Sequence, residues 1–184
     1  VSISAEGWKI VSDSPVKFVR GSGMQALPDP EKGGSLTDLR RFVNVASEDD
    51  FQLLLGIILG SLRPKGPHAV AVFNGEQGSA KGTLVRVVRS LIDPNKASTR
   101  AEPKNEDDLY VAAANSYVLS FDNISRLGPA LADAICRIAT GGGYSKRQLF
   151  TDLEEVIVEV CRPVLLNGIP SLVERPDLLD RATV

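Results

Sequence analysis

The chain reads Asn74-Gly75-Glu76-Gln77-Gly78-Ser79-Ala80-Lys81-Gly82-Thr83 between an apolar run, Ala69 to Phe73, and a helical pattern, Leu84 to Leu91. A strand, a glycine-rich loop and a helix in this order surround a phosphate with backbone N–H groups. Lys81 follows Gly75 by six residues, as the lysine of a phosphate-binding loop (P-loop) does. The alternative is a glycine-rich turn with an incidental lysine. We predict these nucleotide-binding residues: Gly75, Glu76, Gln77, Gly78, Ser79, Ala80, Lys81, Gly82 and Thr83.

Two positions in this loop depart from the usual G-x-x-x-x-G-K-[ST] pattern. Ala80 stands where the last glycine is expected, and Gly82 stands where a hydroxyl normally binds Mg²⁺. Thr83 offers a hydroxyl one residue later, but a helix turns by about 100° per residue, which points that hydroxyl elsewhere unless the loop shifts. We therefore expect nucleotide binding with slow hydrolysis.

A second strand pattern, Tyr117 to Phe121, leads into Asp122 and Asn123. This arrangement is typical of a Walker B strand, which delivers a carboxylate to the water shell of a metal ion. We predict Asp122, together with Thr83, as the Mg²⁺ site. Asn123 stands where many such ATPases have a glutamate, and an amide can orient a water but cannot accept its proton. The alternative for Asp122 is a helix cap or a turn former.

A third strand pattern, Val164 to Leu166, ends in Asn167 and Gly168. An amide at this place suits a sensor of the γ-phosphate, although Asn-Gly is also a common turn. Arg181, with Arg175 as its competitor, is a candidate for an arginine that completes a neighbouring subunit's site. Surface ion pairing is the alternative for both arginines. Our predicted catalytic residues are Lys81, Asp122, Asn123, Asn167 and Arg181.

The alternation of strand and helix patterns predicts an α/β fold with a central, mostly parallel sheet flanked by helices. Strand patterns occupy 69–73, 117–121, 156–160 and 164–166, and helical patterns occupy 47–62, 84–91, 107–114 and 127–139. Two β-prone runs, 8–11 and 16–20, predict a small N-terminal hairpin. We expect residues 1–46 to form this hairpin and a linker, and residues 47–184 to form a P-loop ATPase core that is truncated at its C-terminal end.

The net charge, the apolar stretches and the cysteines of the chain bear on its partners and its location. A formal net charge of −2 gives the chain no overall basic field, so any contact with nucleic acid would depend on a local patch. The longest apolar stretch, Leu53 to Leu62, is too short to cross a bilayer, and no secretory signal pattern precedes it. The two cysteines fit neither a zinc site nor a disulfide framework. We expect a cytoplasmic protein with no membrane partner.

Four segments together resemble a known family. They are Gly75-Glu76-Gln77-Gly78-Ser79-x-Lys81, Ser120-Phe121-Asp122-Asn123, Ala139-Thr140-Gly141-Gly142-Gly143 and Arg175-Pro176-Asp177-Leu178-x-Asp180-Arg181. Over roughly residues 51–184 the chain resembles bacterial and phage ATP-binding proteins related to the virus-type primase-helicases, which are superfamily-three helicases of the AAA+ class. That family usually has Gly-Lys-Ser/Thr in the loop, so Ala80 and Gly82 are departures that bear on activity.

This resemblance implies an ATP and Mg²⁺ site at a subunit interface, assembly of a homo-oligomeric ring, and a basic hairpin that contacts single-stranded DNA. The hairpin would lie between the Walker B and sensor strands, at Gly143 to Phe150, with Lys146 and Arg147 near its tip. Two adjacent cations are equally expected on a solvated turn, where they would have no DNA-binding role.

The function expected from the sequence is an ATP-binding motor core of a DNA replication or mobile-element protein. It would be a helicase-like ATPase that couples ATP binding or hydrolysis to engagement of single-stranded DNA. The alternative is a degenerate nucleotide-binding or oligomerisation module with little or no hydrolysis. A third option, a P-loop kinase for a small acceptor, is disfavoured because the sequence has no obvious lid or acceptor pocket.

Overall fold

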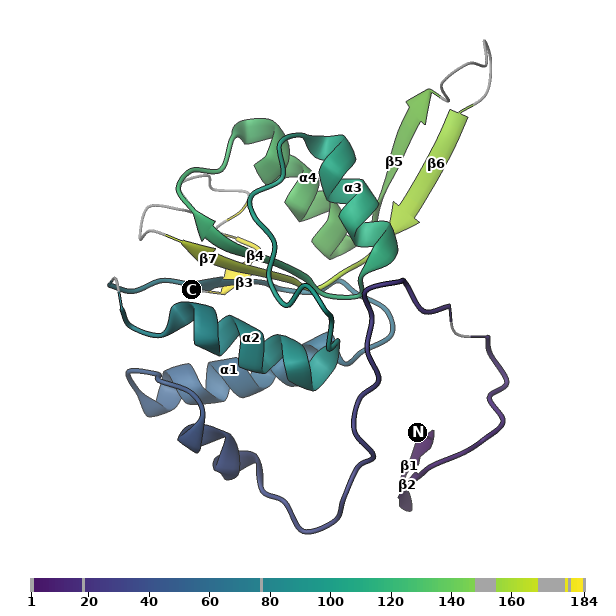
Figure 1. Cartoon of the computed structure of the whole chain (residues 1–184), viewed down its shortest axis with the longest axis vertical. Coiled ribbons are helices and arrows are strands. Elements are labelled where there is room, and N and C mark those ends of the chain that lie inside the picture. Colours follow the sequence, from purple (N-terminus) through teal and green to yellow (C-terminus); the bar gives the residue numbers. More distant parts are fainter. Residues whose placement is uncertain are drawn as a thin grey trace.

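A four-stranded parallel sheet forms the centre of the fold (Figure 1). The computed structural model describes residues 2–17, 19–76, 78–147, 155–168, 178 and 180–183, without the side chains of 146, 147, 155 and 156. From one edge to the other the strands are β4 (Leu119–Ile124), β7 (Val164–Gly168), β3 (Val70–Phe73) and β8 (Ala182–Thr183). Each neighbouring pair is parallel. The predicted α/β fold with a mostly parallel sheet is confirmed.

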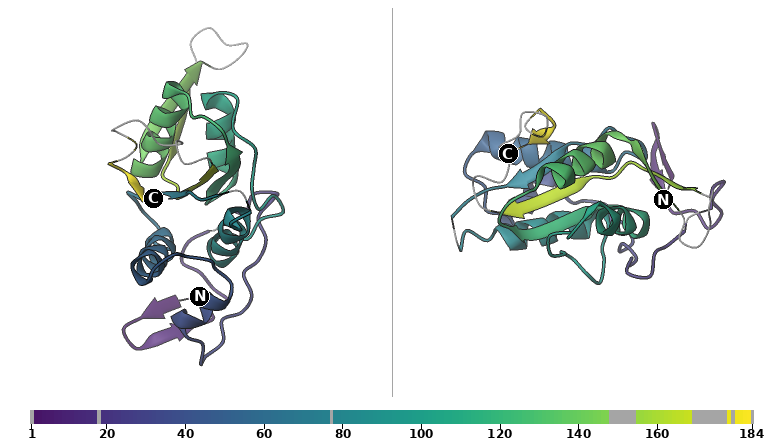
Figure 2. Two further views of the ribbon diagram at one scale, coloured as in Figure 1. Left: turned by 90° about the vertical axis from the view of Figure 1, so that its left-hand side faces the viewer. Right: turned by 90° about the horizontal axis from the view of Figure 1, so that it is seen from above.

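Helices cover both faces of this sheet (Figures 1 and 2). On one face lie α1 (Glu48–Ser61) and α2 (Lys81–Ile92), and on the other lie α3 (Glu106–Asn115) and α4 (Pro129–Thr140). Successive strand residues point to opposite faces, so Ala71 packs with Leu54 and Val88. Val70 and Val72 pack instead with Leu109 and Ile135. The buried-strand pattern in the sequence reflects this coverage on both sides.

A two-stranded ribbon projects from the core beside α3 and α4 (Figure 1). It pairs β5 (Gly142–Arg147) antiparallel with β6 (Glu155–Val160). The pattern at 156–160 therefore pairs with β5 and does not join the main sheet. At the base of the ribbon the ring of Tyr144 stacks on Tyr110, with 4.2 Å between ring centroids. The hydroxyl of Tyr144 donates a hydrogen bond to Asp107 (2.5 Å), and this bond raises the pKa of Tyr144 to about 12.

The N-terminal hairpin exists, but at other residues than predicted. Its strands are β1 (Ser2–Ser4) and β2 (Gly7–Lys9), and residues 16, 17, 19 and 20, the described part of the second predicted run, take no part in it. Gly7, at φ +126°, follows the turn in a conformation that favours glycine. Further along, the short helix η1 (Leu36–Arg41) lies inside the predicted linker, and Leu39 and Val43 pack against the core beside α1.

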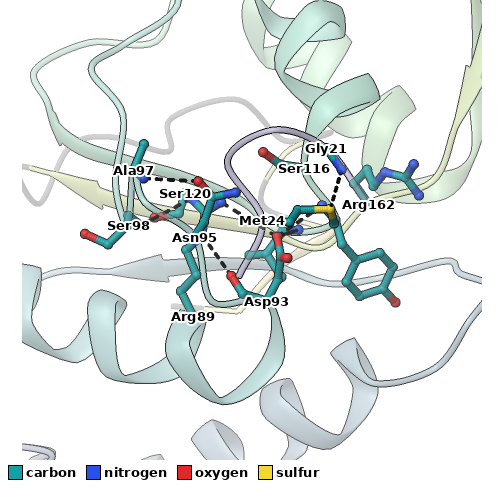
Figure 3. Close-up of polar contacts among 12 residues, drawn as sticks. Gly21, Met24, Arg89, Asp93, Asn95, Ala97, Ser98, Ser116, Ser120 and Arg162 are labelled. Atoms are coloured by element: carbon teal, nitrogen blue, oxygen red, sulfur yellow. Dashed lines mark hydrogen bonds and ion pairs between the residues drawn. The ribbon is translucent and has the colours of Figure 1, made fainter. Parts of the chain in front are cut away.

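A buried polar cluster ties the end of α2 to the start of β4 (Figure 3). Arg89 is 1% exposed, and one of its Nη atoms lies 3.7 Å from Oδ2 of Asp93. The same carboxylate accepts hydrogen bonds from the backbone N–H groups of Tyr117 (3.1 Å) and Val118 (3.0 Å). Burial lowers the pKa of Arg89, and the charge of Asp93 opposes that shift. The N-terminal segment lies against this cluster, because Gln25 N–H donates to the carbonyl of Pro94 (2.8 Å).

We predict that Asp93→Ala lowers the free energy of unfolding by about 3–5 kcal/mol, because it leaves a buried guanidinium without its ion-pair partner. The matched control is Asp49→Ala in the exposed first turn of α1. There the loss should stay below about 1 kcal/mol, the size of a helix-dipole contribution. Urea denaturation measures both variants, and similar losses in the two would contradict a structural role for the cluster.

Candidate functional site

A cleft of about 690 Å³ opens at the carboxyl ends of β3, β4 and β7. Ligands of open α/β sheets bind at this edge, because loops and helix N-termini meet there. The cleft is lined by the loop after β3, the first turns of α2 and the ends of β4 and β7. Its described lining residues are Gly75, Glu76, Gly78, Ser79, Ala80, Lys81, Gly82, Thr83, Arg86, Asp122, Asn123, Asn167 and Gly168. The structure thus gathers the described loop residues with Asp122, Asn123 and Asn167, whereas Gln77 lies outside the described residues.

The side chain of Lys81 folds back across its own loop. Its ammonium donates hydrogen bonds to the carbonyl oxygens of Gly75 (2.6 Å) and Glu76 (2.7 Å), and to Oγ of Ser79 (3.4 Å). These acceptors are neutral, so a phosphate oxygen offers the ammonium a stronger, charge-assisted partner. Lys81 is the first residue of α2, which places its charge at the helix N-terminus.

The N-terminus of α2 differs chemically from those of α1 and α3. Ser47 caps α1 and Asn105 caps α3, and each helix begins with three acidic residues. Ala80 precedes α2 with no side-chain cap, and the first turn of α2 contains no acid. The partial positive charge of this helix end therefore faces the cleft without a neutralising carboxylate in its own first turn.

Asp122 and Asn167 form a hydrogen-bonded pair across neighbouring strands. Nδ2 of Asn167 donates to Oδ1 of Asp122 (2.6 Å), and Asn167 is 5% exposed. The sequence analysis ended the strand at Phe121, but β4 continues to Ile124, with an irregularity in its pairing with β7 after Phe121. Asn123 lies in this irregularity at φ +56° and is exposed. The pairing holds one carboxylate oxygen of Asp122 toward β7.

Gly82 is the loop residue that faces Asp122. A Cβ atom built on Gly82 would lie 3.4 Å from Oδ2 of Asp122 and 3.7 Å from Nδ2 of Asn167. It would also lie 3.4 Å from Nη2 of Arg86, whose Nε donates to the carbonyl of Gly82 (2.9 Å). The sequence analysis did not single out Arg86. Its spacing from Gly82, one helical turn, was the available signal.

The side chains of the cleft do not fit a Mg²⁺ site of the usual P-loop kind. Gly82 provides no hydroxyl at the position that faces Asp122, and a guanidinium lies close to that position. Thr83 lines the cleft but is exposed one residue further along α2. Among the residues that the structure describes, no group of three His, Cys, Asp or Glu side chains is arranged to hold a metal ion. The assignment of Asp122 and Thr83 to Mg²⁺ stays a prediction.

The backbones of Arg181, Lys146 and Arg147 lie away from the cleft. The carbonyl of Arg181 accepts a hydrogen bond from Val70 N–H (2.9 Å) at the amino end of β3, opposite the cleft. Lys146 and Arg147 pair with 156 and 155 near the outer end of the ribbon. Their side chains, the rest of the predicted hairpin (148–150) and Arg175 lie outside the described residues.

A smaller, mostly apolar pocket of about 350 Å³ adjoins the cleft and shares Gly75, Ser79 and Lys81 with it. Val45, Leu53, Leu54, Ile57, Val72, Phe73 and Leu84 provide its apolar lining. Asn44 and Asp50 add polar groups. The two hollows together form a charged compartment next to an apolar one.

Comparison with known proteins places this geometry in context. Residues 36–184 match the family model described as Actinomycete integrative conjugative element replication protein. No curated protein matched the chain. Every helix within the described ranges is too short or too polar to span a bilayer.

We predict that Ala80→Gly keeps or raises the free energy of unfolding, by up to about 1 kcal/mol. Ala80 lies at φ +65°, where an L-residue costs about 1–2 kcal/mol. Glycine removes this cost, but its larger conformational entropy in the unfolded state offsets part of the gain. The control is Ala114→Gly, at an exposed position inside α3, which should lose about 0.5–1 kcal/mol. Thermal denaturation compares the two, and a clear loss in Ala80→Gly would contradict the strained loop.

Proposed function

This chain belongs to the actinomycete integrative conjugative element replication protein family, and we propose that within this replication role residues 47–184 form an ATP-binding core. The observation that carries the proposal is the position of Lys81. Its ammonium lies over a glycine-rich loop, in a cleft that also contains the Asp122–Asn167 pair. An ammonium, an uncapped helix N-terminus and backbone N–H groups are the groups that bind phosphate.

The phosphates would occupy the charged compartment, with the loop N–H groups and Lys81 as donors. On binding, the ammonium would exchange the carbonyls of Gly75 and Glu76 for phosphate oxygens. Asn167 would contact the terminal phosphate, because it is held beside Asp122 at the edge of the cleft. The apolar pocket beside the loop suits the base, since flat heterocycles bind between apolar side chains with a few polar groups for orientation.

Slow hydrolysis is the expected chemistry of this site. Asn123 can orient a water but cannot accept its proton, and Gly82 supplies no metal-binding hydroxyl. The resemblance to superfamily-three helicases of the AAA+ class implies a homo-oligomeric ring. In such a ring Arg181 would lie at the cleft of a neighbouring subunit. The position of Arg181 at the amino end of β3, away from its own cleft, is compatible with such action in trans. The second candidate is a nucleotide-binding or oligomerisation module without hydrolysis, which the missing hydroxyl favours.

The β5–β6 ribbon is the proposed contact for single-stranded DNA. It projects from the core on the side of α3 and α4, and its outer end includes Lys146 and Arg147. Proteins that bind single-stranded DNA without sequence preference hold its phosphate backbone with cationic side chains. The stack of Tyr144 on Tyr110 fixes the base of the ribbon to α3, so its outer end keeps a defined place relative to the core.

The test of ATP binding is Lys81→Ala, which should weaken the affinity by about 1.5–3 kcal/mol, the value of a hydrogen bond to a charged group. Isothermal titration calorimetry with ATP measures this loss. The control is Lys96→Ala, at an exposed lysine that does not line the cleft. If both variants bind ATP as the wild type does, the phosphate-binding loop is wrongly assigned.

The test of DNA contact is the double variant Lys146→Ala with Arg147→Ala. It should lower the affinity for single-stranded DNA and leave the ATP affinity unchanged. The slope of log K against log salt is negative, and its magnitude should decrease by about 0.7 for each lost phosphate contact. Fluorescence anisotropy gives the DNA affinity, with Lys17→Ala and Lys32→Ala, both exposed in the N-terminal segment, as the charge-matched control. Equal DNA binding by both double variants at low salt would contradict a contact between the ribbon and single-stranded DNA.

A further inference from the structure

A polyphosphate bound in the cleft would need positive charges to neutralise it. A P-loop site normally uses a divalent cation, held through the hydroxyl that follows the lysine. Here that residue is Gly82, and the space in front of it faces Asp122 at 3.4 Å from a built Cβ atom. Residue 82 therefore offers no metal-binding group at the place where a P-loop metal would need one.

Arg86 lies beside that place. It comes from the next turn of α2, and its Nε–H holds it to the carbonyl of Gly82 at 2.9 Å. Its Nη2 lies 3.4 Å from where a Cβ atom of residue 82 would be, which is an ordinary van der Waals contact. The same Cβ position lies 3.4 Å from Oδ2 of Asp122, and glycine leaves this place beside Arg86 and Asp122 without a side chain.

We propose that the guanidinium of Arg86 takes the place of the divalent cation, so that this cleft binds a nucleoside polyphosphate without metal. The proposal rests on the proposed ATP-binding function of the same cleft. Arg86 and Lys81 are the cations, and Glu76 and Asp122 the carboxylates, among the described residues that line the cleft. A metal ion beside Asp122 would then have to lie close to a cation, and like charges repel.

The geometry of a guanidinium suits this role. Its planar fork donates two parallel hydrogen bonds to two oxygens of a phosphate, and it stays charged at every physiological pH. The Nε bond to Gly82 uses one of the five N–H groups of the guanidinium. Arg86 is exposed, so it can turn toward the ligand without disturbing the core. It would bind and orient phosphate, with no bond made or broken.

Calorimetric titration of ATP into the full chain tests the proposal, in buffer with Mg²⁺ and in buffer with EDTA. The wild type should bind with Kd values within about threefold of each other in the two buffers. Arg86→Gln, which keeps an amide able to donate to the Gly82 carbonyl but removes the charge, should bind about tenfold or more weakly in EDTA. Arg41→Ala, at an exposed arginine that does not line the cleft, is the control and should match the wild type.

The double variant Gly82→Ser with Arg86→Gln adds a hydroxyl that can bind a metal ion and removes the guanidinium. Its new hydroxyl would face Asp122, so its ATP affinity should rise at least tenfold when Mg²⁺ replaces EDTA. Circular dichroism melting checks that each variant is folded. Wild-type binding that needs Mg²⁺ would overturn the inference and leave the ATP-binding function intact, as would an Arg86→Gln variant that binds like the wild type in EDTA. Absence of wild-type binding in both buffers would overturn the ATP-binding function itself.

Discussion

The position of β7 between β3 and β4 is the constraint on which the candidate site depends. Parallel pairing aligns Phe73 with Asn167 and Phe121 with Leu166, so the three carboxyl ends meet at one edge. The loop after β3 and the pair formed by Asp122 and Asn167 are therefore brought into one cleft, although they are far apart in the sequence. Helices on both faces bury these strands and keep that edge in register.

Much of this arrangement could be predicted from the sequence, because local rules governed it. Buried strand runs, the cap at Ser47 and the glycine-rich loop follow from residue type and spacing, and each lies where the pattern placed it, within a few residues. The partner of the 156–160 strand could not be predicted, because the apolar pattern of a strand does not identify its neighbour. Arg86 could not be predicted either, because a solvated arginine on a helix belongs to no motif. Its proposed role as a phosphate ligand depends on Gly82, one helical turn away.

The unusual residues of the loop form a consistent set. Ala80 adopts the left-handed conformation that a glycine would adopt more easily, and Gly82 leaves the place beside Arg86 and Asp122 without a side chain. In the function proposed above, nucleotide phosphates would be held by the side chains of Lys81 and Arg86 and by the helix N-terminus, and they would be hydrolysed slowly. In a replication protein of a mobile element, such a site would act through binding and assembly more than through rapid turnover.

The most direct test of this account is a crystal structure of the chain with ATP. We expect the triphosphate in the cleft between the loop after β3 and the pair of Asp122 and Asn167. We also expect the ammonium of Lys81 to have left the carbonyls of Gly75 and Glu76 and to contact phosphate oxygens. A nucleotide bound elsewhere on the chain, or a Lys81 still bonded to its own loop beside the ligand, would contradict the account.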